Sequence, residues 1–257
     1  MIKAIFLDFD GTLYTHTDER ILPSTIEAIK KLREKGIKVF ICTGRSKIEL
    51  TWFNLSGLEF DGFIYNNGQV VFDNKDALIY SNPIKGKLKD IIINLFNEKR
   101  LPVMLCDNTD VYINFENEHI RKVQFDVGSE LPEIKQYNNE DIVMAAVYFT
   151  EDRDKDMLMA LKDEAEITYW HQGAVDIVPK GASKSKGIDE TIKYFNIKLE
   201  ETMAVGDGDN DREMIKHCNI GIAMGNSQDS VKEVADYVTD HIDKDGLAKA
   251  FKHYNLI

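Results

Sequence analysis

Short apolar runs alternate with helical patterns at both ends of this 257-residue chain, and this alternation constrains its fold more than any other feature. Apolar runs occur at residues 4–7, 37–42 and 62–65, and again after Pro179 at residues 202–205 and 220–224. Strands that alternate with helices favour parallel βαβ units, in which helices cover both faces of the sheet. The sequence therefore predicts a doubly wound, parallel-sheet (Rossmann-like) α/β domain assembled from the two ends of the chain.

The first helix has clear start and stop signals. Residues 24–27 (Ser-Thr-Ile-Glu) match a capping box, in which the first and fourth side chains bond to backbone amides at the helix start. Ile26, Ile29 and Leu32 then recur at helical spacing, and a glycine such as Gly36 is typical of a helix end. The pattern predicts a helix that Ser24 caps and that stops before Gly36.

The middle of the chain changes to hairpins mixed with helices. Paired apolar runs within residues 70–80 and 103–115 predict β-hairpins, and a helix that begins near Lys87 has one apolar face. This mixture indicates an α+β domain inserted into the α/β domain. We expect the core domain to comprise residues 1–82 and 182–257, and the inserted domain to comprise residues 83–181.

Composition excludes several classes of protein. The chain is 43% hydrophobic, and its 32 Lys and Arg against 44 Asp and Glu give a formal net charge of −12. That much apolar material argues against disorder, and the acidic charge argues against binding nucleic acid or membrane surfaces. Cys42, Cys106 and Cys218 are far apart in the sequence, which favours a reducing compartment. We expect a cytoplasmic protein that is a monomer or a weak homodimer.

Two carboxylates, Asp8 and Asp10, directly follow the first predicted strand in the sequence Asp8-Phe9-Asp10-Gly11-Thr12. Alternate side chains of an extended segment point the same way, so both acids can address one point beyond the strand. Open α/β sheets bind ligands at that edge, and a divalent cation with oxygen ligands would offset the repulsion between the acids. An exposed acidic turn is the alternative interpretation.

A second acidic loop, Gly206-Asp207-Gly208-Asp209-Asn210-Asp211, follows another apolar run. Its three acids and one Asn offer the hard oxygen ligands that suit Mg²⁺. An acidic turn is again the alternative for this loop by itself. Two such loops at the ends of two predicted parallel strands favour one shared site.

Two further segments supply groups that can bind phosphate. The Thr43 hydroxyl and the backbone N–H of Gly44 end the second predicted strand and can hold a phosphate oxygen, although Thr also ends strands for purely structural reasons. Lys184 lies where the chain returns from the inserted domain and provides a positive charge. A solvated, Lys-rich linker is the alternative for that segment.

Taken in order, these segments resemble the four motifs of the haloacid dehalogenase-like hydrolase superfamily. The inserted α+β domain, with Asn66-Asn67-Gly68 before it, resembles the cap of the Cof-type branch, many of whose members are sugar-phosphate phosphatases. The resemblance covers the whole chain. It is specific for the type of activity and much less informative about the substrate.

The resemblance implies a role for each matched residue. Asp8 would be the nucleophile, and Asp10 the general acid and base. Mg²⁺ would be held by the carboxylates of Asp8 and Asp207 and by the backbone carbonyl of Asp10, with Asp211 nearby. The groups expected to hold the phosphoryl oxygens are Thr43, Gly44, Lys184 and Asn210. Lys186 is an alternative to Lys184, because a Gly often follows the family lysine directly and here Gly187 follows Lys186.

The resemblance therefore implies a Mg²⁺-dependent phosphatase of small phosphorylated metabolites, with sugar phosphates as the expected class and an aspartyl phosphate as the intermediate. Two alternatives stay open. A phosphomutase would use the same nucleophile and return the phosphoryl group to the sugar. A receiver-like phosphorylated signalling module would also combine acids, a Thr and a Lys around Mg²⁺, but such modules lack a large insert.

Overall fold

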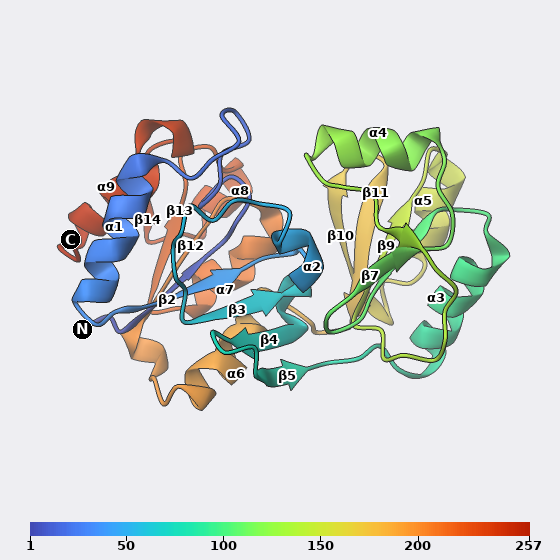
Figure 1. Ribbon diagram of the computed structural model, residues 1–257, viewed down its shortest axis with the longest axis horizontal. Helices are drawn as coiled ribbons and strands as arrows, with labels where there is room; N and C mark the ends of the chain where they lie inside the picture. The colour runs from blue at the N-terminus through green and yellow to red at the C-terminus, as the bar shows by residue number, and fades with distance from the viewer. The chain divides into compact units, whose positions relative to one another are not determined.

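A computed structural model describes the backbone of residues 1–257 and every side chain except that of Asp152. The chain divides into two compact units (Figure 1). The first unit comprises Met1–Gly44, Asn54–Tyr80 and Ser183–Ile257, and the second comprises Arg45–Phe53 and Ser81–Ala182. The sequence did not predict that Arg45–Phe53 groups with the second unit. The domain limits expected from the sequence remain a prediction.

An eight-stranded sheet forms the centre of the first unit, in the order β14-β13-β12-β1-β2-β3-β4-β5. The strands are β1 (Ala4–Leu7), β2 (Lys38–Cys42), β3 (Gly62–Tyr65), β4 (Val70–Asp73), β5 (Leu78–Ser81), β12 (Thr202–Gly206), β13 (Ile220–Ala223) and β14 (Tyr237–Val238). The strands from β14 to β3 are parallel, and β4 runs antiparallel to β3. The predicted α/β class with a parallel sheet is confirmed.

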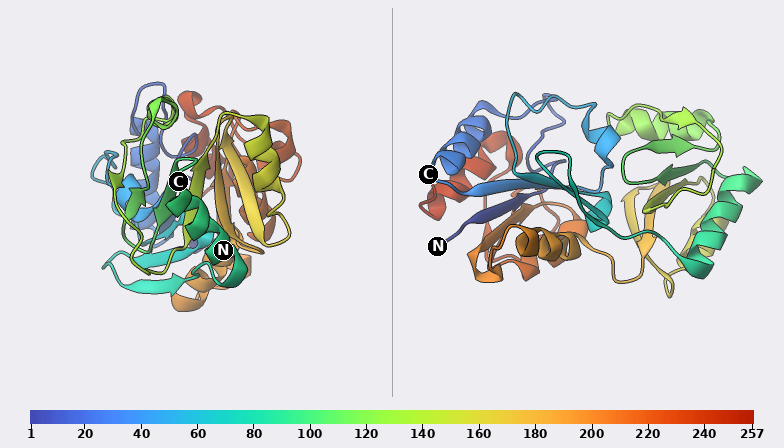
Figure 2. Two further views of the ribbon diagram at one scale, coloured as in Figure 1. Left: turned by 90° about the vertical axis from the view of Figure 1, so that its right-hand side faces the viewer. Right: turned by 60° about the horizontal axis from the view of Figure 1, so that its bottom comes forward.

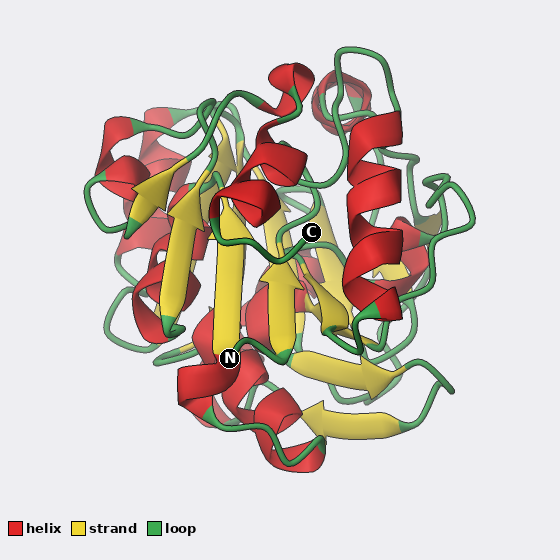
Figure 3. Ribbon diagram, turned by 90° about the vertical axis from the view of Figure 1, so that its left-hand side faces the viewer, coloured by secondary structure: helices red, strands yellow, loops and turns green.

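Helices cover both faces of this sheet (Figures 2 and 3). On one face lie α1 (Pro23–Glu34) and α9 (Gly246–His253), and on the other lie α6 (Lys184–Tyr194) and α7 (Arg212–His217). A shorter helix, α8 (Asp229–Lys232), contacts β13. Phe6 of β1 stacks on Phe40 of β2 with ring centroids 5.0 Å apart, and both belong to the core that includes Ile188 of α6. Asp8, which directly follows β1, is therefore attached to a fully buried strand.

The start of α1 differs from the prediction. The helix begins at Pro23 with Leu22 as its N-cap, and no side chain caps it. Proline fits the first helical position because its missing N–H would have no partner there, so the helix starts one residue before Ser24. The Ser24 hydroxyl instead donates a hydrogen bond of 2.5 Å to Asp245. The predicted capping box is therefore wrong, whereas the predicted end before Gly36 is confirmed.

The second unit contains a six-stranded sheet in the order β10-β11-β9-β6-β7-β8. Its strands are β6 (Val103–Cys106), β7 (Val111–Ile113), β8 (Glu133–Ile134), β9 (Met144–Tyr148), β10 (Ala165–His171) and β11 (Ala174–Pro179). Its helices are α2 (Lys47–Leu50), α3 (Gly86–Glu98), α4 (Glu118–Asp126) and α5 (Asp152–Met159). The apolar sides of α3 and α5 pack on the sheet, which confirms an α+β arrangement. Among the described residues, no helix has the length and apolar character needed to cross a membrane.

Candidate active site

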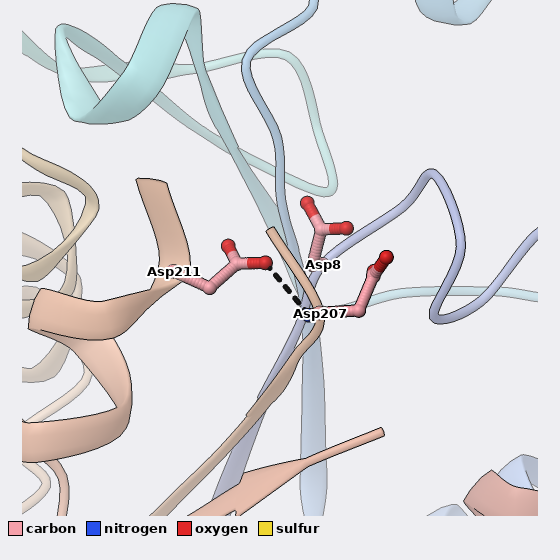
Figure 4. Close-up of side chains that lie close together, drawn as sticks. All are labelled: Asp8, Asp207 and Asp211. Carbon is pink, nitrogen blue, oxygen red and sulfur yellow. Dashed lines mark hydrogen bonds between the residues drawn. The ribbon is translucent and has the colours of Figure 1, made fainter. Parts of the chain in front are cut away.

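The two predicted acidic loops meet at one edge of the first unit's sheet. β1 and β12 are parallel neighbours, with Leu7 opposite Val205, and the Asp8 amide donates a hydrogen bond of 2.9 Å to the Val205 carbonyl. The chain therefore leaves both strands at the same edge. One carboxylate oxygen from each of Asp8, Asp207 and Asp211 lies within 4.8 Å of the others (Figure 4). This arrangement is the shared oxygen-rich site that the sequence predicted.

The carboxylate of Asp10 lies outside this group of three acids. Its side chain is 34% exposed, and its Oδ1 lies 2.7 Å from Nε2 of His16. The metal role expected for Asp10 concerns its backbone carbonyl, so a carboxylate that points elsewhere is compatible with that expectation. The sequence analysis gave His16 no role.

Lys184 lies at the first position of α6 with its ammonium group between two of the acids. Its Nζ donates hydrogen bonds of 2.6 Å to Oδ1 of Asp8 and 2.6 Å to Oδ1 of Asp211, and its side chain is fully buried. Lys186, the alternative left open by the sequence, is 48% exposed and faces Glu190. The structure therefore brings Lys184, and not Lys186, to the acids.

A close backbone contact fixes the start of α6 beside the sheet. Gly68, which ends the short 3-10 segment after β3, has a φ of +92°. A Cβ atom at Gly68 would lie 2.0 Å from the carbonyl oxygen of Ser183, the residue before Lys184. Only glycine allows both this φ and this approach. The contact holds the start of α6, and with it Lys184, against the segment that follows β3, although Lys184 is 176 positions from Asp8 in the sequence.

Asp211 and Asp207 have different partners. Oδ2 of Asp211 accepts a hydrogen bond of 2.9 Å from the Asp207 amide (Figure 4). It also accepts one of 2.9 Å from the Gly208 amide, so Asp211 shapes its own loop. Oδ1 of Asp207 accepts from the Thr12 hydroxyl at 2.7 Å, and Oδ2 accepts from Asn226 Nδ2 at 3.2 Å. These bonds hold the Asp207 carboxylate, one of whose oxygens lies within 4.8 Å of an oxygen of Asp8.

Burial and the charges of neighbouring groups shift the pKa of Asp8, Asp207 and Lys184. Burial, and then repulsion from Asp211, raise the pKa of Asp8 well above its ordinary value. Burial, again with repulsion from Asp211, raises the pKa of Asp207 to about 7. Burial opposes the charge on Lys184, but the attraction of Asp211 and Asp8 outweighs it and raises the pKa of Lys184. Fully ionised, three carboxylates and one ammonium carry two net negative charges, which a divalent cation with hard oxygen ligands would balance.

Three of the four residues expected to hold phosphate, Thr43, Gly44 and Asn210, lie close to Asn67. Thr43 is fully buried at the end of β2, and its carbonyl accepts a hydrogen bond of 3.1 Å from the Asn67 amide. A Cβ atom at Gly44 would lie 3.2 Å from Oδ1 of Asn67, and Nδ2 of Asn210 donates to that same oxygen at 2.9 Å. Asn67 itself is buried, and its backbone adopts the left-handed conformation, with a φ of +55°.

Four residues around the site were given no role by the sequence analysis. They are Thr12, His16, Asn67 and Asn226. Thr12 and Asn67 stand inside segments that carried the family resemblance, so their position was a usable signal. Asn226 stands in residues 222–227, to which the resemblance also extends. The contact of His16 with Asp10 depends on how the loops fold, and no local pattern indicates it.

Replacement of Gly11 by Ala is expected to disrupt the acidic site. Gly11 has a φ of +78°, and a Cβ atom there would lie 2.4 Å from Oδ2 of Asp207. Gly36 has the same φ of +78° but no atom within 4 Å of its Cβ position, so Gly36→Ala is a matched control for backbone strain alone. Both variants should lose roughly 1 kcal/mol of stability from the left-handed backbone. Only Gly11→Ala should also weaken binding of Mg²⁺, measured by titration calorimetry; equal Mg²⁺ affinity in the two variants would contradict this geometry.

The chain matches the family model of haloacid dehalogenase-like hydrolases over residues 5–251. The protein belongs to this family, and it is an enzyme of the phosphatase type. It is 33% identical to YkrA of Bacillus subtilis (strain 168), a phosphatase by name, over 99% of this chain and 98% of YkrA. It is 30% identical to the 5-amino-6-(5-phospho-D-ribitylamino)uracil phosphatase YcsE of the same organism, over 99% of this chain and 96% of YcsE.

Solved structures agree with this assignment. The HAD subclass IIB sugar phosphatase BT4131 superposes with a TM-score of 0.89 and 37% identity, over 99% of this chain and 100% of that protein. The phosphatase BT1666 from Bacteroides thetaiotaomicron superposes with a TM-score of 0.88 and 32% identity, over 100% of this chain and 96% of that protein. The resemblance inferred from the motifs is therefore confirmed.

Proposed function

We propose that the protein is a Mg²⁺-dependent phosphatase that hydrolyses small phosphorylated metabolites, with sugar phosphates as the substrate class, through an aspartyl phosphate on Asp8. The observation that carries the proposal is the position of Asp8. Its carboxylate follows a buried strand, lies next to those of Asp207 and Asp211, and contacts the Lys184 ammonium at 2.6 Å. A nucleophilic carboxylate needs positive charge beside it before it can approach a phosphate dianion.

The substrate class is supported by the names of the relatives. BT4131 is described as a sugar phosphatase, and the substrate in the name of YcsE carries its phosphate on a ribityl chain. Both names describe phosphate on a hydroxylated carbon chain. We infer that the protein acts on substrates of this chemistry.

The residues present fit a Mg²⁺ ion. The carboxylates of Asp8 and Asp207 and the backbone carbonyl of Asp10 would hold it, and Asp211 would stay bound to its loop amides and to Lys184. Bound there, the ion would supply positive charge that offsets the repulsion between Asp8 and the substrate. That repulsion is on the order of 10 kcal/mol for a carboxylate near 3 Å from a dianion at an effective dielectric near 20.

The residues of the chain would then act in two steps. An oxygen of Asp8 attacks phosphorus as the bond from phosphorus to the ester oxygen breaks, and Asp10 donates its proton to the departing alcohol. In the second step Asp10 takes a proton from water as that water attacks phosphorus, and the bond to Asp8 breaks to release inorganic phosphate. Lys184, with Thr43, Gly44 and Asn210, would hold the phosphoryl oxygens.

A phosphate-release screen tests the proposal. Purified protein with Mg²⁺ is expected to release inorganic phosphate from hexose and pentose phosphates faster than from nucleotides or cofactor phosphates. No release from any member of the panel would contradict the proposed activity. Conversion of one sugar phosphate isomer into another without loss of phosphate, dependent on a bisphosphorylated activator, would assign the phosphomutase alternative instead.

Mg²⁺ is expected to raise the melting temperature more near pH 8 than near pH 6. The pKa of Asp207 is raised to about 7 in the folded protein, so its contribution favours folding at low pH and is lost as pH rises through about 7. The metal-free protein should lose stability over that range, and Mg²⁺ should restore it by binding the ionised form. Thermal unfolding with and without Mg²⁺ at both pH values measures the difference; an equal shift at both would contradict the expectation.

We also propose a cytoplasmic location and a monomer or weak homodimer. Cys42, Cys106 and Cys218 are each buried in the structure and are far apart in the sequence, which supports a reducing compartment. Sedimentation of the purified protein over a range of concentrations tests the oligomeric state.

A further inference from the structure

A small hairpin after β1 places His16 beside Asp10. The amide of Thr15 donates to the Arg20 carbonyl at 2.9 Å, and the amide of Arg20 donates to the Thr15 carbonyl at 3.2 Å, so the chain turns back between them. Tyr14, just before this turn, stacks on Phe9 at 5.3 Å and contacts the His16 ring edge-on at 5.5 Å. Within this turn, Nε2 of His16 lies 2.7 Å from Oδ1 of Asp10.

The hairpin is anchored on both sides of His16 by one distant carboxylate. The Thr15 hydroxyl donates to Oδ1 of Asp243 at 2.6 Å, and the Thr17 hydroxyl donates to Oδ2 of Asp243 at 3.0 Å. Asp243 is 226 positions from Thr17 in the sequence. The two neighbours of His16 are therefore held by the two oxygens of the same group, and the histidine between them is held as well.

A second contact ties the same C-terminal segment to the nucleophile loop. Nδ2 of Asn226 donates to the Gly11 carbonyl at 2.9 Å, and its Oδ1 accepts from the Ile242 amide at 3.0 Å. The segment that anchors His16 is thus connected, through one side chain, to the backbone between Asp10 and Thr12. The same C-terminal segment therefore contacts both the hairpin that carries His16 and, through Asn226, the loop that carries Asp10.

The contact between His16 and Asp10 matters for orientation more than for stability. Both side chains are partly exposed, at 42% and 34%, and exposed ion pairs contribute little to folding. The carboxyl group of an aspartate rotates over a broad range when nothing fixes it, whereas proton transfer requires defined geometry. An ionised carboxylate can only accept, and a protonated carboxyl group keeps an accepting oxygen, so Nε2–H of His16 can donate to Asp10 in either state and fix the plane of its carboxyl group.

We propose that His16 is a positioning residue that orients the carboxyl group of Asp10 for proton transfer, with Asp243 as the anchor of the hairpin that carries it. The proposal rests on the proposed phosphatase function and adds a residue that acts through Asp10. In this proposal, the hydrogen bonds from Thr15 and Thr17 to Asp243 keep His16 in place.

The test compares two substrates that differ in their need for a proton. An alkyl phosphate such as a hexose phosphate releases a strongly basic alkoxide, which must be protonated as it leaves. The p-nitrophenolate of p-nitrophenyl phosphate leaves without a proton at neutral pH. Because kcat/KM reports the steps up to the first irreversible one, it isolates formation of the aspartyl phosphate, the step in which Asp10 acts as an acid.

His16→Ala is expected to lower kcat/KM for the hexose phosphate on the order of tenfold, and for p-nitrophenyl phosphate by less than about twofold. His16→Gln, whose amide N–H can still reach Asp10, should recover part of the loss. Thr17→Val should produce the same substrate-selective loss to a smaller extent. His253→Ala is the matched control, because His253 is an exposed histidine that stacks on Tyr237.

The outcomes separate this proposal from the proposed function. If the wild type is active and His16→Ala loses activity equally on both substrates, or on neither, the role of His16 is overturned and the proposed phosphatase function stands. Absence of wild-type activity on both substrates overturns both. Circular dichroism and thermal unfolding of each variant show whether a loss comes from misfolding, and a His16→Ala variant that unfolds would also contradict the account, since this partly exposed pair is not expected to support the fold.

Discussion

Asp8→Asn is expected to abolish phosphate release, with a fall in kcat of at least about 10⁴-fold, while the protein stays folded. The neutral amide oxygen is a far weaker nucleophile than the carboxylate, so no aspartyl phosphate is expected to form. The fold should survive because Asn has nearly the same shape and its oxygen can still accept from Lys184. Burial and repulsion from Asp211 and Asp207 disfavour a charge on Asp8 and raise its pKa. A neutral amide at this position relieves both effects.

The matched control for this variant is Asp209→Asn. Asp209 lies in the same acidic loop as Asp207, but its side chain is 67% exposed and faces Arg212 at 3.4 Å. Its replacement should leave kcat within about twofold, since it contacts none of the three clustered acids and exposed pairs contribute little. Steady-state kinetics measure kcat of both variants, and circular dichroism shows whether each variant is folded. Residual activity above about 1% in folded Asp8→Asn would remove Asp8 from the role of nucleophile.

Lys184→Met is expected to reduce both stability and activity. Without the ammonium, the buried carboxylates of Asp8 and Asp211 lose a shared partner at 2.6 Å. Breaking a buried pair by removing one member costs about 3–5 kcal/mol, because the remaining charge stays uncompensated. The fall in kcat should be at least about 10³-fold, since Lys184 would also face the phosphoryl oxygens.

The loss of stability in Lys184→Met should be larger near pH 8 than near pH 5. The pKa of Asp8 is already raised in the folded protein, so its protonation favours the fold at low pH, and this contribution is lost as pH rises. Lys184 itself stays charged across this range, because its pKa is raised further above its ordinary value. Denaturant unfolding at the two pH values measures the difference.

Two further variants test whether the effect comes from the buried charge. Lys186→Met is the matched control, because Lys186 is on the same helix, is 48% exposed and should have little effect on either quantity. Lys184→Met combined with Asp211→Asn should recover part of the stability but none of the activity. A single Lys184→Met variant as stable as the wild type at both pH values would contradict the account.

Most strands and the order of the acidic motifs could be predicted from the sequence because their signals are local, whereas the two-residue strands β8 and β14 were not predicted. Runs such as Ala4–Leu7 are fully buried in a parallel sheet, and such strands appear as continuous apolar segments. The meeting of Asp8 and Asp207 follows from topology, since adjacent parallel strands end at the same edge. The start of α1 was wrong because Pro23 and Ser24 offer competing start signals, and the proline signal determines where this helix begins.

Other features depend on contacts that no short pattern records. The helix α4 was not predicted, although Asn117 caps it by accepting from the Ile120 amide at 3.0 Å. The position of Lys184 beside the acids depends on the close approach of Gly68 to Ser183, which brings distant segments together. The pairing of His16 with Asp10 depends on an anchor more than 200 positions away. In each case loops must fold together before the contact exists.

One structure determination tests the central claim most directly. The protein crystallised with Mg²⁺ and beryllium fluoride, which mimics a phosphoryl group on a carboxylate, is expected to show beryllium bonded to an oxygen of Asp8. A Mg²⁺ ion should be bound between Asp8 and Asp207, with a fluoride in reach of Lys184. Beryllium fluoride on another residue, or a Mg²⁺ ion that contacts neither acid, would contradict the account.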